Sequence, residues 1–359
     1  MLRQLAVSGT HYDCGLQVGR ACAEILRAVV AHDRAAPPAG LRWEEARRAA
    51  APYLAATERA FPWVVEELRG AAEGAGVDFL DLFVDSIEEL ATASPPPAPL
   101  ASPGGGDTGR CSDFAAAAPA TAEGRVLLGH NNDLAPETAP WLTAVTWDLP
   151  DQPRLLTIGV GGIFVSIGVN AAGLALTGNE LQPNDDRPGI PRLLIARALL
   201  GAGTFEAALA VALHPQRASS YNNLISSRDG RLVSVEGSAT DHELLWPEAG
   251  WLVHTNHYIH PRMQRYERAP DKLAGSRSRY ARAQALMAAR PGPLTAPMLR
   301  GFLADHGPGG PDGQGAETPL CRHAGESRTV FSAVIDLTAG TVEAALGNPC
   351  AAVFTRVWG

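Results

Sequence analysis

The sequence predicts an α+β protein in which a mostly helical N-terminal segment precedes layers of helices and antiparallel strands. Two observations carry this prediction. Apolar side chains recur at helical spacing in residues 1 to about 92, whereas short strand-like runs dominate from residue 111 onward. Two helical stretches, 191–200 and 204–213, stand between two groups of strands, which fits a layered arrangement better than a parallel βαβ sheet.

The N-terminal segment contains four expected helices with recognisable start or stop signals. In chain order they are a helix opening at the capping-box pair Thr10 and Asp13, a helix over 43–59, a helix containing Val64 to Ala72 that stops at Gly74-Ala-Gly76, and a helix capped by Asp78. On the first of these, Cys14 and Cys22 fall on the apolar face, so both are expected to be buried core thiols.

The strands expected after residue 111 are short and bounded by turn residues. In chain order they are 114–120 with 126–128, then 141–148, 154–158, 164–168, 174–177, 221–226, 232–236 and 251–255, and a closing hairpin of 329–336 with 341–345. Residues 276–305 are expected to be helical. The chain shows no internal repeat, and its one low-complexity stretch is the Pro/Gly-rich run over 94–106.

Composition restricts the classes of partner. The chain is 46% hydrophobic with a mean hydropathy of −0.04, as in globular proteins with a sizeable core, and its net charge of −8 argues against a nucleic-acid or anionic-membrane partner. The N-terminal residues lack a long apolar run, so we expect a cytoplasmic protein. The cysteines are odd in number and lack CxxC spacing, which favours free thiols: Cys14, Cys22, Cys111, Cys321 and Cys350. Cys321 and Cys350 are expected to be core thiols by default.

Cys111 occupies an unusual position for a structural cysteine. It follows the Pro/Gly linker over 94–110 and stands where the chain enters the first strand of a hairpin. Structural cysteines normally lie within strands or helices and face the core. A thiol at this point could attack the peptide bond that precedes it and become a new N-terminus.

Several segments of the sequence are similar to one known family. The stretch Gly-Arg-Cys111-Ser-Asp-Phe-Ala, followed by Glu-Gly-Arg-Val-Leu-Leu-Gly129-His-Asn-Asn-Asp133, resembles the start of the mature chain of acyl-coenzyme A:aminopenicillanic acid acyltransferases, also called isopenicillin N acyltransferases. These are N-terminal-nucleophile (Ntn) hydrolases. Shorter matching segments follow in the same order along nearly the whole chain: 9–15, 67–76, 168–174, His254-Thr-Asn-His257, Asp305-His306 and Cys321-Arg-His323.

The resemblance implies a fold and a maturation step. The fold would be a four-layer αββα sandwich of two antiparallel sheets, with the N-terminal segment included in the same structural domain. Self-cleavage between Arg110 and Cys111 would give an alpha chain (1–110) and a beta chain (111–359) that stay associated and could form a homo-oligomer. By the same resemblance, Asp133 and Asn256 match the active-site aspartate and asparagine, beside the nucleophile Cys111.

The chemistry of these residue types fits that role. Cleavage would free an α-amine at Cys111 with a reference pKa of about 7.7–8.0, which can serve as general base for its own thiol. An acyl-enzyme thioester would follow, and the amide of Asn256 could donate to the oxyanion. We therefore expect an amidohydrolase or acyltransferase that acts on a small amide or thioester and needs no cofactor or metal. Asp113, Asn131 and His257 are the candidate substrate-binding residues.

Two alternatives and two departures from the family pattern accompany this prediction. The alternatives are a catalytically silent Ntn-fold binding protein and a metal-dependent hydrolase that uses His254, His257 and His260, whose HxxH spacing is a weak metal pattern without a known carboxylate partner. The departures are Arg110, where the family usually has glycine, and Asp113, whose carboxylate would raise the pKa of the nearby thiol and favour amine-bearing substrates.

Overall fold

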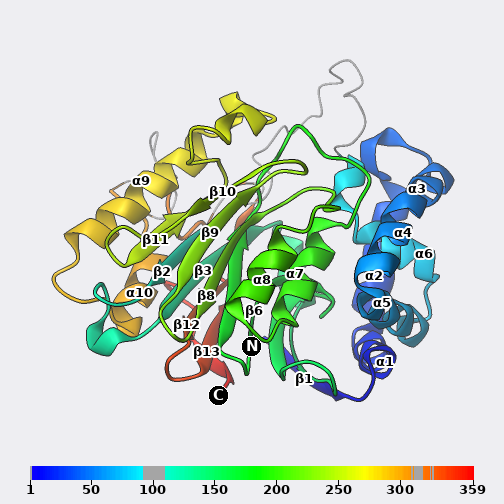
Figure 1. The fold of residues 1–359 in the computed structure, drawn as a ribbon, viewed down its shortest axis with the longest axis horizontal. Coiled ribbons are helices and arrows are strands. Elements are labelled where there is room, and N and C mark those ends of the chain that lie inside the picture. Colours follow the sequence, from blue (N-terminus) through cyan, green and yellow to red (C-terminus); the bar gives the residue numbers. More distant parts are fainter. Residues whose placement is uncertain (1, 92–109, 309, 311–317, 324, 326) are drawn as a thin grey trace.

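The computed structural model describes residues 2–91, 110–308, 310, 318–323, 325 and 327–359, and it contains two β-sheets packed face to face (Figure 1). In spatial order the eight-stranded sheet contains β1 (Arg3–Ser8), β4 (Leu142–Asp148), β5 (Leu155–Val160), β6 (Phe164–Asn170), β7 (Leu174–Asn179), β8 (Asn222–Ser227), β9 (Leu232–Gly237) and β10 (His242–Leu245). The six-stranded sheet contains β11 (Trp251–His254), β2 (Arg110–Ala116), β3 (Leu127–Leu134), β12 (Arg328–Asp336), β13 (Thr341–Leu346) and β14 (Thr355–Trp358).

Helices cover the outer face of each sheet, which confirms the expected four-layer αββα sandwich (Figure 1). Helices α7 (Arg192–Leu200) and α8 (Phe205–Ala212) pack on the eight-stranded sheet, and α9 (Ala274–Ala289) and α10 (Ala296–Leu303) pack on the six-stranded sheet. Between the sheets, β2 and β3 face β7, and apolar side chains from both sheets form a common core that includes Leu128, Ile158, Ile167, Leu224 and Phe331.

The eight-stranded sheet is antiparallel, as expected, except for one parallel pair at its edge. Strand β1 pairs in parallel with β4, with Arg3 opposite Thr143 and Ser8 opposite Asp148. The chain between these strands contains all the N-terminal helices and the β2–β3 hairpin. Such a long connection can return the chain in the same direction, which a short hairpin turn cannot do.

The N-terminal segment is helical, as expected. Its helices are α1 (His11–Ala21), α2 (Ala23–Ala35), α3 (Trp43–Ala49), α4 (Ala51–Ala60), α5 (Pro62–Ala75) and α6 (Phe79–Asp85). Thr10 and Asp13 form the predicted capping box, and the Asp78 carboxylate accepts from two backbone N–H groups of α6. The single helix expected over 43–59 is two helices, because Pro52 is compatible only with a first helical turn and therefore starts α4.

These helices share one hydrophobic core with α7, α8 and the outer face of the eight-stranded sheet. Cys14 and Cys22 lie in that core, as predicted, beside side chains such as Val145 and Trp147. Helices α1 and α5 touch through glycines: a Cβ on Gly15 would lie 2.0 Å from the Glu67 carbonyl oxygen. The two backbones could not approach this closely with larger residues.

Three short strands were not expected, nor were two further helix breaks, one at Cys22 between α1 and α2 and one between α9 and α10. Strands β1, β10 and β14 are edge strands of four to six residues, too short to show clear alternation. The helical region over 276–305 divides into α9 and α10 around Pro291-Gly292-Pro293. The predicted linker over 94–110 lies outside the described residues except for its last residue. Within the described part of the chain, no helix has the length and apolar character to cross a membrane.

Candidate active site

Cys111 lies near the start of β2, and its side chain borders a cavity that is lined by residues of both sheets and of α7. Its backbone N–H donates to Asn256 Oδ1 at 2.9 Å, and its Sγ lies 3.8 Å from Asn132 Oδ1. The residue is only 8% exposed, and that exposed part opens into the cavity. A buried thiol at the wall of a cavity can contact a bound small molecule without being open to bulk solvent.

The register of the β2–β3 hairpin determines which side chains share the face of Cys111. Cys111 pairs with Asn132, and Asp113 pairs with His130. Because alternate residues of a strand point to the same face, these four side chains lie on the side of the other sheet. On the opposite face, towards α9 and α10, lie Ser112 of β2 and Asn131 and Asp133 of β3.

The cavity has a volume of about 300 Å³, and its lining contains both polar and apolar residues. Besides Cys111, His130 and Asn132, its polar lining residues include Glu88, Ser166, Thr177, Asn179, Glu180, Tyr221 and Asn223. Its apolar lining residues are Leu134, Val160, Phe164, Val165, Leu176, Leu193 and Ala196. A cavity of this kind suits a small molecule with an apolar group and a polar function.

Asn256 and Arg279 hold the backbone around Cys111. Asn256 Oδ1 accepts from the Cys111 N–H and from Arg279 Nη2, at 2.9 Å in both cases, so the hydrogen-bond network fixes the orientation of the amide. Its Nδ2 donates to the Glu180 carbonyl at 3.1 Å. Arg279 Nη1 donates to the Cys111 carbonyl at 2.6 Å and to Ser112 Oγ at 3.1 Å. The fully buried guanidinium thus links α9 to the start of β2.

Sequence reasoning missed Arg279, although a pattern in the sequence could have indicated it. Ser276, Arg279, Ala283 and Met287 are the buried residues of α9, and their spacing follows one helical face. An arginine on an otherwise apolar face requires a buried partner. The partner proves to be the backbone and side chains around Cys111.

The surroundings of the Cys111 thiol favour its neutral form. Burial raises its pKa well above the usual value, and the carboxylates of Asp113 and Asp133 raise it further, while the Arg279 guanidinium acts in the opposite direction. The effect of Asp113 has the direction that the sequence predicts. A thiol in this state needs a base to remove its proton during nucleophilic attack.

Asp133 lies beside the Arg110–Cys111 peptide bond and does not line the cavity. In the hairpin register it pairs with Arg110, one position before the Cys111–Asn132 pair. Its buried carboxylate accepts a hydrogen bond of 2.7 Å from Thr329 Oγ1 on β12. In the strand register Asp133 is therefore the residue opposite Arg110, next to the bond expected to be cut.

The three candidate substrate-binding residues are buried and form hydrogen bonds with other groups of the protein. None of them lines the cavity. Asp113 Oδ1 pairs with His130 Nδ1 at 2.8 Å, and it is His130 that reaches the cavity. Asn131 Nδ2 donates to the carbonyls of Leu303 and Leu320. His257 Nδ1 lies 2.8 Å from Ser276 Oγ, and burial lowers the pKa of its imidazole to about 3.

The histidines of the 254–260 stretch have separate partners. His254 lies between Asn179 Oδ1 and Glu236 Oε1, at 2.9 and 2.8 Å, and is fully buried. His257 contacts Ser276 instead, and the His260 imidazole lies 4.0 Å from Glu243. Among the described residues, the one group arranged to hold a metal ion contains none of these three histidines. The metal-dependent alternative therefore finds no support at this stretch.

An ionic cluster around the buried Arg192 guanidinium contributes residues to the cavity lining, and sequence reasoning did not identify it. Arg192 donates to Glu88 Oε2 at 2.7 Å and to Glu180 Oε1 at 3.3 Å, and its guanidinium lies over the Tyr221 ring. Burial raises the pKa of Glu180 to about 7, although Arg192 opposes the change. Glu88, Glu180 and Tyr221 all reach the cavity, so they are candidates for contact with the polar part of a ligand.

Comparison with known proteins gives one family match. The family model described as "Acyl-coenzyme A:6-aminopenicillanic acid acyl-transferase" matches residues 120–351, which is most of the region after the proposed cleavage point and begins nine residues after Cys111. No curated protein matches the chain.

Solved structures similar to this chain share little sequence with it. Two structures of conjugated bile acid hydrolase from Clostridium perfringens, both of variants, have 13% and 12% identity with TM-scores of 0.43 and 0.44; they align with 68% and 69% of this chain and 96% and 97% of their own. Penicillin V acylase from Agrobacterium tumefaciens has 14% identity and a TM-score of 0.39, with 69% of this chain and 85% of its own aligned.

Proposed function

The chain belongs to the acyl-coenzyme A:6-aminopenicillanic acid acyl-transferase family, and we propose that it is a self-cleaving cysteine enzyme that transfers small acyl groups through a thioester on Cys111. The observation that carries the proposal is the position of Cys111. Its thiol borders the cavity, its backbone nitrogen donates to Asn256, and its carbonyl accepts from Arg279.

Maturation would begin with attack of the Cys111 thiol on the Arg110 carbonyl. The C–N bond breaks, the Cys111 nitrogen takes up the thiol proton, and Arg110 is left as a thioester on Sγ. Water then hydrolyses the thioester, which releases the Arg110 carboxylate and regenerates the thiol. Asp133 is the carboxylate nearest to this bond in the strand register, so it is suited to orient the water or the new ammonium group.

Turnover would use the amine that this cut produces. The Cys111 nitrogen already lies 2.9 Å from Asn256 Oδ1, which would hold the free amine beside its own thiol. With a reference pKa of about 7.7–8.0, the neutral amine can take the thiol proton as Sγ attacks a substrate carbonyl. This base compensates for the raised pKa of the buried thiol.

The oxyanion formed in that attack needs a donor close to Sγ. The amide nitrogen of Asn256 carries two N–H groups, of which the Glu180 carbonyl takes one. The second can donate to the oxyanion, while Oδ1 continues to hold the Cys111 nitrogen. A donor aimed at developing charge in a buried site lowers the barrier, typically by about 3–4 kcal/mol.

The cavity indicates the substrate class. Its apolar lining residues, which include Phe164, Leu176 and Leu193, suit the acyl chain of a small amide or thioester. Its acidic lining residues, Glu88 and Glu180, suit the leaving or accepting group, such as an amine. The acyl-enzyme is the same whether water or an amine accepts the acyl group, so the proposal includes hydrolysis and transfer.

Intact mass spectrometry tests the proposal. The purified protein should yield two chains, 1–110 and 111–359, that elute together in gel filtration. Cys111→Ala should remain one chain, whereas Cys22→Ala, which removes a core thiol, should be cleaved normally. Incubation of the cleaved enzyme with small thioesters should add one acyl mass to the 111–359 chain only. A single uncleaved chain that never becomes acylated would reject the enzyme and favour a silent binding protein.

A further inference from the structure

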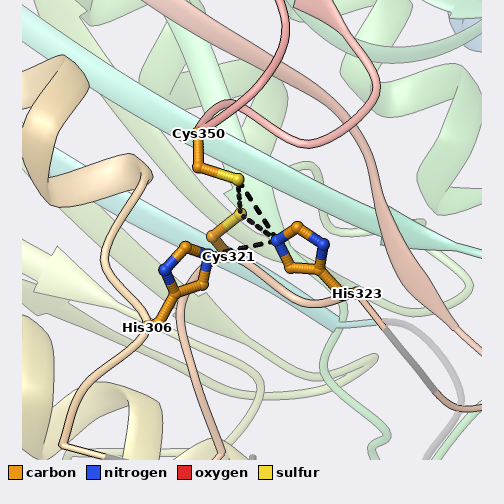
Figure 2. A group of neighbouring side chains, drawn as sticks. All are labelled: His306, Cys321, His323 and Cys350. Atoms are coloured by element: carbon orange, nitrogen blue, oxygen red, sulfur yellow. Dashed lines mark hydrogen bonds between the residues drawn. The ribbon is translucent and has the colours of Figure 1, made fainter. Parts of the chain in front are cut away.

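Four metal-binding side chains from three separate segments meet near the six-stranded sheet (Figure 2). His306 follows α10, Cys321 and His323 precede β12, and Cys350 lies between β13 and β14. Cys321 is buried as expected, but Cys350 is exposed, so the expectation of a core thiol is wrong for Cys350. None of the four side chains lines the Cys111 cavity.

The potential ligand atoms point at a common centre (Figure 2). His323 Nε2 lies 3.1 Å from His306 Nε2, 3.2 Å from Cys350 Sγ and 3.5 Å from Cys321 Sγ. The two sulfur atoms are 3.6 Å apart, and one ligand atom from each residue lies within 4.8 Å of the others. The two thiols and two imidazoles thus form one compact cluster of potential ligand atoms.

Hydrogen bonding alone does not account for this arrangement. A ring nitrogen carries either one proton or one lone pair, so His323 Nε2 can form one good hydrogen bond and not three. A metal ion at the centre would take one lone pair from each of the four atoms. Zn–N bonds of about 2.0–2.1 Å and Zn–S bonds of about 2.3 Å in a tetrahedron imply N···N, N···S and S···S separations of about 3.4, 3.6 and 3.8 Å. The three separations from His323 Nε2 and the S···S separation lie within a few tenths of an ångström of these values, and the two separations from His306 to the sulfur atoms are within 4.8 Å.

We propose that His306, Cys321, His323 and Cys350 bind a zinc ion. Tetrahedral sites with two sulfur and two nitrogen ligands are typical of zinc. Binding would release the two thiol protons and coordinate the thiolates with the Nε2 atoms of both imidazoles. Because the protein supplies all four ligands, no position is left for water or substrate, and the site is structural.

The contacts around the cluster indicate what the ion stabilises. It would join the chain after α10, the segment before β12 and the β13–β14 connection, none of which has regular secondary structure at its ligands. The same region contacts strand β3. Asn131 on β3 donates hydrogen bonds to the Leu303 and Leu320 carbonyls. Thr329 Oγ1 accepts from the Arg322 N–H and donates to Asp133. The ion would therefore fix the layer behind Asn131 and Asp133.

Metal analysis of the untagged protein, purified without chelator, tests the proposal. Inductively coupled plasma mass spectrometry should find about one zinc per chain, and Cys350→Ser should reduce the content at least tenfold. Cys350 is exposed, so this variant should still fold. Cys22→Ala is the matched control and should retain its zinc. Failure of the purified protein to contain or take up zinc would overturn the proposal, as would retention of zinc by Cys350→Ser.

Cobalt substitution and thiol counting separate zinc from a disulfide. Cobalt(II) protein should show the visible bands of a tetrahedral site and a thiolate charge-transfer band, which should fall to about half in any residual complex of Cys350→Ser. Chelated, denatured protein should react with a thiol reagent at all five cysteines. Only three reactive thiols in protein that is denatured without reducing agent, with no metal bound before denaturation, would indicate a Cys321–Cys350 disulfide and refute the zinc site.

Discussion

The substitution Asn256→Asp tests the proposed catalytic geometry most directly. The two side chains have the same shape, and the carboxylate keeps an acceptor for the Cys111 N–H and for Arg279 Nη2. It loses the amide N–H groups, of which one donates to the Glu180 carbonyl and the other is assigned to the oxyanion. Loss of one oxyanion donor should cost about 3 kcal/mol of transition-state stabilisation, or roughly two to three orders of magnitude in kcat.

The assay is steady-state kinetics on protein that has been cleaved, compared across pH. The added carboxylate raises the pKa of the Cys111 thiol in the same way as Asp113, so rates must be compared on the alkaline plateau of each pH profile. Asn256→Ala removes the donor without adding charge and should lose a similar factor in kcat. If either loss appears in KM alone, Asn256 binds the ground and transition states equally, and its assignment as oxyanion donor is refuted.

Two further predictions concern the departures from the family pattern. Arg110→Gly should accelerate precursor cleavage, because a smaller residue crowds the scissile bond less, and mass spectrometry over time measures the rate. The variant should leave kcat of the cleaved enzyme unchanged. An unchanged cleavage rate would mean that crowding does not limit cleavage. Asp113→Asn keeps a hydrogen-bonding group for His130 but removes a charge that raises the thiol pKa, so the acid limb of the pH–rate profile should move to lower pH by up to about one unit. Asp151→Asn, at an exposed site, is the control, and equal profiles for the two variants would contradict this account.

Much of the fold could be predicted because its elements carry local patterns. Capping residues marked the starts of α1 and α6, and alternating or apolar runs marked the strands of both sheets that are long enough to show a period. The parallel pairing of β1 with β4 could not be predicted in this way. It joins segments 140 residues apart, and nothing local to residues 3–8 specifies a partner.

The candidate site was predictable only in part, for a related reason. Sequence position identified Cys111, and the structure places Asn256 against its backbone nitrogen across 145 residues. Asn131 and Asp133 were selected from the same short motif as Asn132, but strand alternation sends only Asn132 to the cavity. The choice among adjacent polar residues depends on which face of β3 meets the other sheet, and that face is set by packing between sheets.

Strand β3 connects the proposed active site to the proposed zinc site through its two faces. Its even-numbered residues, His130 and Asn132, reach the cavity beside Cys111. On the odd-numbered side, Asn131 binds two carbonyls of the chain around the metal cluster, and Asp133 accepts from Thr329, which also binds Arg322. A strand can position catalytic groups accurately only if its reverse face is fixed as well. The segment on that face has no regular secondary structure at Cys321 or His323. Coordination of one ion by four side chains would be sufficient to fix its position. Zinc loss should therefore disturb the proposed active site through the odd-numbered face of β3, without removing any group that contacts substrate.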